Sequence, residues 1–184
     1  DAGVAVEGLA VAEDQDHVGG LGGDHGAVVA ALAAVEDREI GAEILLQPAI
    51  EIRPLKVTDT SDRTLDLLDR MDWIVFSSSN GVRCFFDRLL DPMRERDVRA
   101  LGAIKIAAIG PGTAEELARF HLRADCVPDE FRAESLAQSL ASGAAGKRFL
   151  LVRASRGREV LAEELTKAGG IVEQVVVYES VDVQ

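Results

Sequence analysis

Three turns rich in small polar residues follow three short apolar runs of the sequence, "WIVF", "IAAI" and "FLLV", and each turn leads into a helical pattern. A helix start offers backbone N–H groups without intrahelical partners and a partial positive charge. Small side chains let a ligand approach that backbone closely. These turns therefore favour the binding of carboxylates or phosphates, and their candidate binding residues are Ser77, Ser78, Ser79, Asn80, Gly110, Gly112, Thr113, Arg153, Ser155 and Arg158.

A purely structural interpretation of the same turns stays open. Serine and threonine at helix starts commonly cap the helix, and Gly-Pro commonly forms a turn. The arginines of the third turn, Arg153, Arg156 and Arg158, either clamp acidic groups or form a solvated loop. None of the turns contains GxGxxG or GxxxxGK[ST], so the sequence gives nucleotide binding no specific support.

The single tyrosine, Tyr178, ends the last apolar run in "VVVYES". From there its phenol could reach the proposed binding edge and donate a proton or hydrogen bond, or it could simply pack in the core. No Ser/His/Asp set and no metal-ligand spacing can be assembled, so the residue pattern predicts no metal site. Cys84 and Cys126 form no CxxC pair and are expected to be reduced thiols.

Strand and helix patterns alternate along the chain from residue 42 onward, with the longest helical pattern ending at Gly169 and Gly170. Such alternation predicts an α/β fold, a parallel-sheet flavodoxin-like domain whose strand ends share one edge. Strands are expected at 42–52, 73–76, 104–109, 124–128, 148–152 and 171–179, and helices at 61–70, 80–90, 111–120, 133–142 and 157–170.

The charge balance also limits the function. The net charge is −12, from 20 basic and 32 acidic residues, which argues against a nucleic-acid-binding protein. The longest apolar run, 27–35, is too short to span a bilayer, and no signal peptide is evident, so we expect a cytoplasmic protein that binds no membrane. Residues 1–40 hold nine acidic residues and one basic residue, and are expected to be an atypical low-complexity segment.

Six segments occur in a recognisable order: "QPAIEIRP", "DWIVFSSSNGVRCFF", "IAAIGPGTAEEL", "VPDEFRAESL", "GKRFLLVRASRGREVL" and "VVVYES". Together they resemble the uroporphyrinogen-III synthase family. No single segment is diagnostic, but the ordered set is fairly specific. The resemblance covers about residues 41–183.

The resemblance implies a monomeric, cofactor-independent lyase of tetrapyrrole biosynthesis. Its substrate is hydroxymethylbilane, a linear tetrapyrrole with eight carboxylate arms, which is cyclised with inversion of ring D and loss of water to give uroporphyrinogen III. It also implies that Ser77, Ser78, Ser79 and Thr113 face the substrate cleft and that the turn around Arg158 lines it. Tyr178 would be the proton donor to the departing hydroxyl.

The family has two α/β lobes joined by two extended crossovers. On this chain the resemblance implies a first crossover at 41–54, a complete second lobe at 55–178, and a second crossover at 179–184 that is cut short. We expect residues 50–180 to fold and the chain alone to turn over substrate poorly. A non-catalytic flavodoxin-like module that binds an anion or a protein remains the alternative, and the position of Tyr178 relative to Ser77–Ser79 distinguishes the two.

Overall fold

A computed structural model describes residues 50–55, 65–66, 68–157 and 159–182 of the chain. The chain divides into two compact units. One comprises Asp1–Glu51 with Val181–Gln184, and the other comprises Ile52–Ser180. The described part of the first unit contains only the start of strand β1 and the end of strand β5. The second unit contains the core and the elements considered below. In chain order the elements are β1 (Ile50–Pro54), η1 (Leu68–Arg70), β2 (Trp73–Phe76), α2 (Ser79–Leu89), η2 (Pro92–Arg94), η3 (Val98–Leu101), β3 (Lys105–Ala108), α3 (Pro111–Arg119), α4 (Ala133–Ala141), β4 (Arg148–Ala154), α5 (Val160–Lys167) and β5 (Ile171–Asp182).

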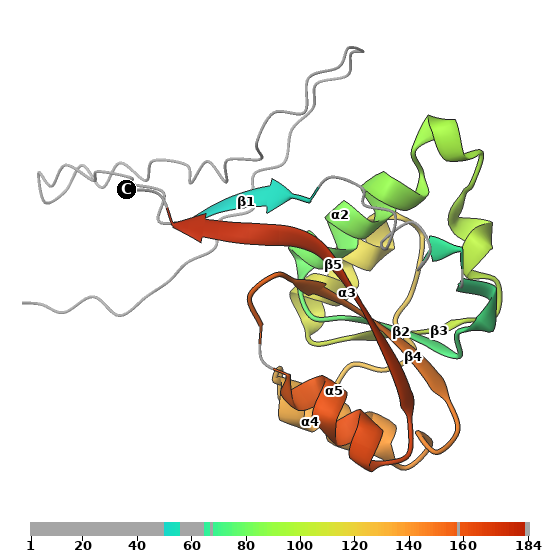
Figure 1. Cartoon of the computed structure of the whole chain (residues 1–184), viewed down its shortest axis with the longest axis vertical. Coiled ribbons are helices and arrows are strands. Elements are labelled where there is room, and N and C mark those ends of the chain that lie inside the picture. Colours follow the sequence, from blue (N-terminus) through green and yellow to red (C-terminus); the bar gives the residue numbers. More distant parts are fainter. Residues whose placement is uncertain (1–49, 56–64, 67, 158, 183–184) are drawn as a thin grey trace, which may run out of the picture. The chain divides into compact units, whose positions relative to one another are not determined.

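The strands form one sheet in the spatial order β1-β5-β4-β2-β3. Strands β2, β3, β4 and β5 pair in parallel, which confirms the predicted parallel α/β fold. Numbered along the chain, these four strands lie in the order 2-1-3-4, so the strand order reverses between β2 and β4, and the crevice beyond the carboxyl ends there is where such folds bind ligands. Strand β1 runs in the opposite direction beside β5 (Figure 1).

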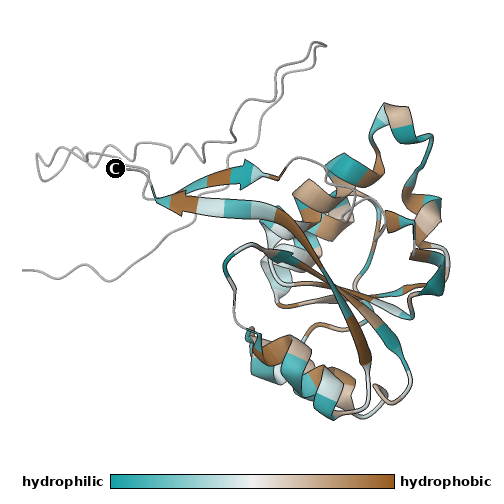
Figure 2. Cartoon of the chain, in the orientation of Figure 1, coloured by the Kyte–Doolittle hydropathy of each residue, from teal (hydrophilic) through white to brown (hydrophobic). Residues whose placement is uncertain are grey.

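Helices cover both faces of the sheet, α2 and α3 on one face and α4 and α5 on the other (Figure 1). Successive side chains of β2 point to opposite faces of the sheet. Ile74 and Phe76 belong to the core under α2 and α3, and Val75 belongs to the core under α4 and α5. Figure 2 shows the apolar residues concentrated in the strands. Strands β2 and β4 are covered on both faces, which explains why their apolar runs in the sequence are uninterrupted.

Several predicted elements differ from the observed ones. The strand expected at 124–128 is only a single bridge between Ala107 and Cys126, because the chain leaves the sheet edge after that residue. Of the helix expected at 61–70, most residues lie outside the described part, and Leu68–Arg70 form a short 3₁₀ helix. The strand expected at 42–52 is described only from Ile50.

Helix ends follow local chemistry. Ser78 caps α2, since its hydroxyl accepts a hydrogen bond from the Gly81 amide at 3.0 Å. Helix α3 begins with Pro111, whose missing N–H has no partner to lose at that position. Gly169, with φ of 85°, follows α5 in the left-handed conformation that glycine adopts without strain. Among the described helices none is long and apolar enough to cross a bilayer.

Candidate functional site

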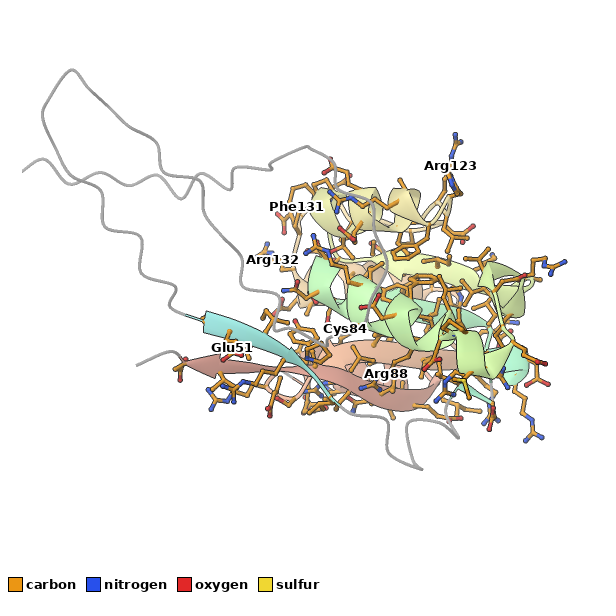
Figure 3. The ribbon with its side chains drawn as sticks, turned by 90° about the horizontal axis from the view of Figure 1, so that it is seen from above. Glu51, Cys84, Arg88, Arg123, Phe131 and Arg132 are labelled. Atoms are coloured by element: carbon orange, nitrogen blue, oxygen red, sulfur yellow. The ribbon has the colours of Figure 1, made fainter. Side chains whose placement is uncertain are left out.

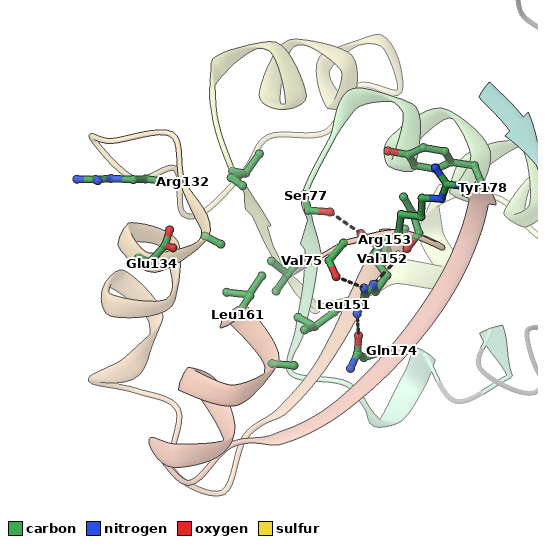
Figure 4. Close-up of a pocket in the computed structure, with 16 residues that line it drawn as sticks. Val75, Ser77, Arg132, Glu134, Leu151, Val152, Arg153, Leu161, Gln174 and Tyr178 are labelled. Carbon is green, nitrogen blue, oxygen red and sulfur yellow. Dashed lines mark hydrogen bonds between the residues drawn. The ribbon is translucent and has the colours of Figure 1, made fainter. Parts of the chain in front are cut away.

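A pocket of about 360 Å³ opens at the carboxyl ends of β2 and β4, where the strand order reverses. The helix starts of α4 and α5 form its other wall (Figure 4). Apolar side chains such as Val75, Leu151 and Leu161 line its floor, and polar groups lie around its rim. Of the predicted binding residues, Ser77, Arg153 and Tyr178 line this pocket.

Two serines of the first turn connect the strands around the pocket. The Ser77 hydroxyl donates to the Val152 carbonyl at 3.3 Å and so bridges β2 and β4. The Ser78 hydroxyl lies 3.0 Å from the phenol oxygen of Tyr178, and either group can donate that proton. The helix cap, the pocket wall and the tyrosine therefore belong to one hydrogen-bonded group.

Tyr178 reaches Ser78 because β5 contains a bulge. Arg153 pairs with Val176, whereas the next residue, Ala154, pairs with Tyr178, so Val177 is an extra residue in the ladder. A bulge changes the face to which the following side chains point. Val177 and Tyr178 both belong to the core under α2 and α3, and the tyrosine is only 7% exposed. Tyr178, whose position relative to Ser77–Ser79 the sequence left open, lies beside the serine turn with its phenol largely buried.

The guanidinium of Arg153 is hydrogen-bonded to other groups of the protein. Its guanidinium donates to the Gln174 side-chain oxygen at 2.6 Å, to the Gly157 carbonyl at 2.9 Å and to the carboxylate of Glu159. Hydrogen bonds from Gln174 and Arg153 hold the pKa of Glu159 below its usual range. The arginine side chain is 14% exposed, so it shapes the pocket wall and has little surface left for a ligand.

The second turn lies next to the first. A side chain on Gly112 would come within 3.9 Å of the Ser79 hydroxyl, so the starts of α2 and α3 are neighbours. At Gly110 a Cβ would lie 3.1 Å from the Cβ of Phe131, which explains the glycine by close packing. Thr113 is 5% exposed and does not line the pocket.

The remaining predicted residues occupy different places. Asn80 is half-buried in the first turn of α2, and Ser155 is exposed after β4, where its amide donates to the Tyr178 carbonyl at 2.8 Å. Arg158 lies outside the described residues.

Sequence reasoning missed three polar residues of the pocket rim: Arg132, Glu134 and Gln174. Arg132 and Glu134 lie at the start of α4 and come from "VPDEFRAESL", a segment that the resemblance contained without assigning it a role. Arg132 forms an ion pair with Glu130. Arg132 and Tyr178 lie at opposite ends of the pocket (Figure 4).

Three helix starts at this edge lack a side-chain cap. Helices α3, α4 and α5 each begin without a hydrogen bond from the capping side chain, in contrast to α2. Their first amides are available to oxygen atoms of an anion. Within the described residues no group of His, Cys, Asp and Glu side chains is arranged to hold a metal ion. The site is thus suited to an anionic organic ligand.

Comparison with protein families gives one match over most of the chain. A family model described as uroporphyrinogen-III synthase HemD matches residues 31–184. The chain is 34% identical over 149 residues to the uroporphyrinogen-III synthase of Synechococcus elongatus, a match that covers 80% of this chain and 55% of that protein. It is 26% identical to the uroporphyrinogen-III synthase of Chlorobaculum parvum, covering 79% of this chain and 57% of that protein. The chain thus spans about half the length of these relatives.

Solved structures show the same likeness in the fold. A mutant uroporphyrinogen III synthase from Thermus thermophilus superposes with a TM-score of 0.60 at 19% identity, covering 79% of this chain and 56% of that one. A second Thermus thermophilus structure of this synthase gives a TM-score of 0.52 at 21% identity, covering 79% of this chain and 57% of that one. At these identities the similarity shows that the fold is shared.

Proposed function

The chain belongs to the uroporphyrinogen-III synthase family, and from this premise we propose that the protein cyclises hydroxymethylbilane to uroporphyrinogen III. The reaction inverts ring D and releases water, which makes the enzyme a cyclising lyase of haem and other tetrapyrrole synthesis. The protein works as a cytoplasmic monomer without a cofactor in this proposal. Residues 55–178 would form one lobe of the family fold, with the crossovers at 41–54 and 179–184.

The observation that carries the proposal is the 3.0 Å contact between Ser78 and Tyr178 beside the pocket. Loss of water from hydroxymethylbilane requires a proton on the departing hydroxyl. A phenol held by a second hydroxyl group can supply that proton, because the Ser78 hydroxyl can donate its hydrogen bond to the phenolate that remains. The carbon–oxygen bond then breaks, water leaves, and the freed carbon bonds to the substituted α-carbon of ring D. The bond from that α-carbon to its old bridging carbon breaks, the bridging carbon bonds to the other α-carbon of ring D, and the proton lost there returns to the phenolate.

The uncapped helix starts account for recognition of an eightfold carboxylate in a protein of net charge −12. Amides at the start of α3, those of Gly112 and Thr113, and amides at the starts of α4 and α5 would bind carboxylate arms. Local dipoles set the potential at a site even where the whole protein is acidic.

Polar side chains at the edge of the pocket complete this proposed binding surface. Ser77 and Arg156 lie on the pocket wall, and Ser79, Asn80 and Ser155 lie in the adjoining turns. Gly110 keeps its turn free of a side chain, and Arg158 stays a candidate on its sequence position alone. Arg153 would act through the shape of the wall, given its bonds to Glu159 and Gln174.

The experiment is a cyclisation assay with purified chain and hydroxymethylbilane. Uroporphyrinogen III is separated by chromatography from the ring isomer that forms without inversion, and binding of the bilane is measured in parallel. We expect binding and an excess of the inverted isomer, at a rate below that of full-length relatives because this chain spans about half their length. A chain that neither binds the bilane nor raises the inverted isomer above the uncatalysed background would refute the proposal.

One observation favours a second function, a binding module without catalysis: Tyr178 is only 7% exposed. A module of this kind would bind polycarboxylates at the helix starts and leave the phenol as a core group. Replacing Tyr178 with phenylalanine separates the two, because the module would keep its affinity and would show no inverted isomer with or without the phenol.

A further inference from the structure

The buried arginine of α2, Arg88, has a role that the pocket does not explain. It is 8% exposed and lies beside the apolar side chains of Phe85 and Leu89 on the covered face of the helix. A buried guanidinium is tolerated only where its N–H groups find acceptors. Figure 3 shows Arg88 between α2 and β5.

Among the described residues, Arg88 donates to main-chain carbonyls of the segments by which the chain enters and leaves this unit. Its guanidinium donates to the Val177 carbonyl at 3.1 Å, to the Val176 carbonyl at 3.5 Å and to the Leu55 carbonyl just after β1. The Leu55 amide in turn donates to the Val177 carbonyl at 3.0 Å. Arg88 therefore joins α2, the end of β1 and β5 at one point.

This point coincides with the bulge. Val177 is the extra residue of β5, and an extra residue disrupts the regular ladder on both sides. Carbonyls that lose ladder partners inside a protein need other donors. Arg88 donates to the Val176 carbonyl and also to the Val177 carbonyl, which accepts from the Leu55 amide as well, so removal of the arginine takes two side-chain donors from the bulge.

The bulge in turn determines where Tyr178 points. Because of the bulge, the side chains of Val177 and Tyr178 lie on the same face of the sheet, and the phenol of Tyr178 contacts the Ser78 hydroxyl. Helix α2 therefore contacts β5 from both ends of the helix, through Ser78 at its start and Arg88 near its end. At the normal rise of an α-helix these two residues are about 15 Å apart along the helix axis.

We propose that Arg88 is a positioning residue for Tyr178: it stabilises the bulge at Val176 and Val177 and thereby keeps the phenol on the Ser78 hydroxyl. The consequence for catalysis rests on the proposed function, in which Tyr178 is the proton donor. The position of the Tyr178 phenol can be measured without any turnover. Failure of Arg88 to position Tyr178 is therefore distinguishable from failure of Tyr178 to act as the proton donor.

The chain contains a single tyrosine, so carbon-13 labelling of the tyrosine ring carbon that bears the hydroxyl gives one NMR resonance, which reports the hydrogen bond of Tyr178. The Ser78→Ala variant defines the shift that follows loss of the bond. Arg88→Met should move the resonance in the same direction, and Arg88→Lys by a smaller amount, because lysine keeps the charge but donates from a single nitrogen. Arg83→Gln is the matched control, since Arg83 lies on the same helix and pairs with Glu116 of α3.

Folding is verified for each variant by circular dichroism and urea unfolding. If Arg88→Met does not fold, Arg88→Lys decides. A folded Arg88 variant whose tyrosine resonance stays at the wild-type position would overturn the positioning claim, as would an equal shift in Arg83→Gln. Where turnover is measurable, we expect kcat of Arg88→Lys to fall with little change in KM, and an unchanged kcat with a shifted resonance would overturn the link to catalysis.

Discussion

The hydroxyl of Ser78 and the phenol of Tyr178 lie 3.0 Å apart although 100 positions separate them in the chain. The serine follows β2 and caps α2, and the tyrosine lies in β5, with β4 between the two strands. The contact spans this gap because the bulge at Val177 turns the tyrosine toward α2. One hydrogen bond thus links a helix cap to the group proposed to donate a proton.

Removal of the phenol oxygen tests the chemistry directly. We expect Tyr178→Phe to lower kcat for uroporphyrinogen III formation by about 10²- to 10⁴-fold, the usual contribution of a general acid, with KM nearly unchanged. The fold should remain, because the ring still fills its place in the core. Initial rates with hydroxymethylbilane give the answer, and a kcat close to that of the unaltered chain would exclude Tyr178 as the donor.

Ser78 and Ser79 are neighbours with different roles, which makes them a matched pair for stability. Ser78→Ala removes the cap of α2 and the partner of Tyr178, and should lower the free energy of unfolding by about 1–2 kcal/mol. Ser79 is the first residue inside the helix, so Ser79→Ala should stay within about 0.5 kcal/mol. Urea unfolding followed by circular dichroism measures both, and equal losses would contradict the capping role.

Acid should lower the free energy of unfolding through protonation of Asp72, which directly precedes β2. A hydrogen bond from the Lys147 ammonium, and then one from the Arg148 amide, lower the pKa of this carboxyl from its usual value. A depressed pKa in the folded state stabilises the protein above the unfolded-state pKa, about 4, and that stabilisation disappears as the pH falls through the folded-state pKa.

The substitution Asp72→Asn exposes this dependence. The difference in unfolding free energy between wild type and variant should be largest near neutral pH and should shrink as the pH falls below about 4. Lys147→Met removes the same pair from its other side and should show the same trend. Urea midpoints across the acid range measure it, and a difference that is independent of pH would show that Asp72 acts by some other means.

Two glycines without positive φ differ in what a side chain would meet. At Gly170 an added Cβ would lie 2.9 Å from the Leu165 carbonyl oxygen and 3.0 Å from the buried ring of Phe149. At Gly110 the nearest atoms are the Cβ of Phe131 at 3.1 Å and its Cγ at 3.2 Å, and this residue is 62% exposed, so less of the core must shift with it. Gly170→Ala should therefore cost about 1–3 kcal/mol and Gly110→Ala less. Thermal unfolding ranks them, and the reverse order would be inconsistent with this packing.

Much of the fold follows from short-range sequence features. The helix over 80–90 was predictable because Val82, Phe85, Phe86 and Leu89 recur on one face, and the observed helix is Ser79–Leu89. Likewise Pro111 predicts the start of α3, which the structure confirms. The strand expected near Cys126 was wrong because one bridge was all that the chain made before leaving the sheet.

The site was harder to predict from the sequence because its main contacts join residues that are far apart in the chain. Strand alternation from Val175 and Val177 would place Tyr178 on the opposite face, and only the bulge corrects this. For Arg153 the sequence left open a clamp for acidic groups or a solvated loop, and the partners Glu159 and Gln174 come from other elements of the fold. Nothing in the sequence pattern indicated that Arg88, at the margin of an apolar helix face, is buried.

Strand β1 lies beside β5, and the amide of Leu55 bonds to the carbonyl of Val177, so the chain enters and leaves the Ile52–Ser180 unit through adjacent strands. A module with neighbouring entry and exit points can be inserted into a loop of another protein without forcing the ends of that loop apart. The Ile52–Ser180 unit is therefore suited to insertion into a loop of a host protein, with the hydrogen bonds of Arg88 joining its entry and exit segments.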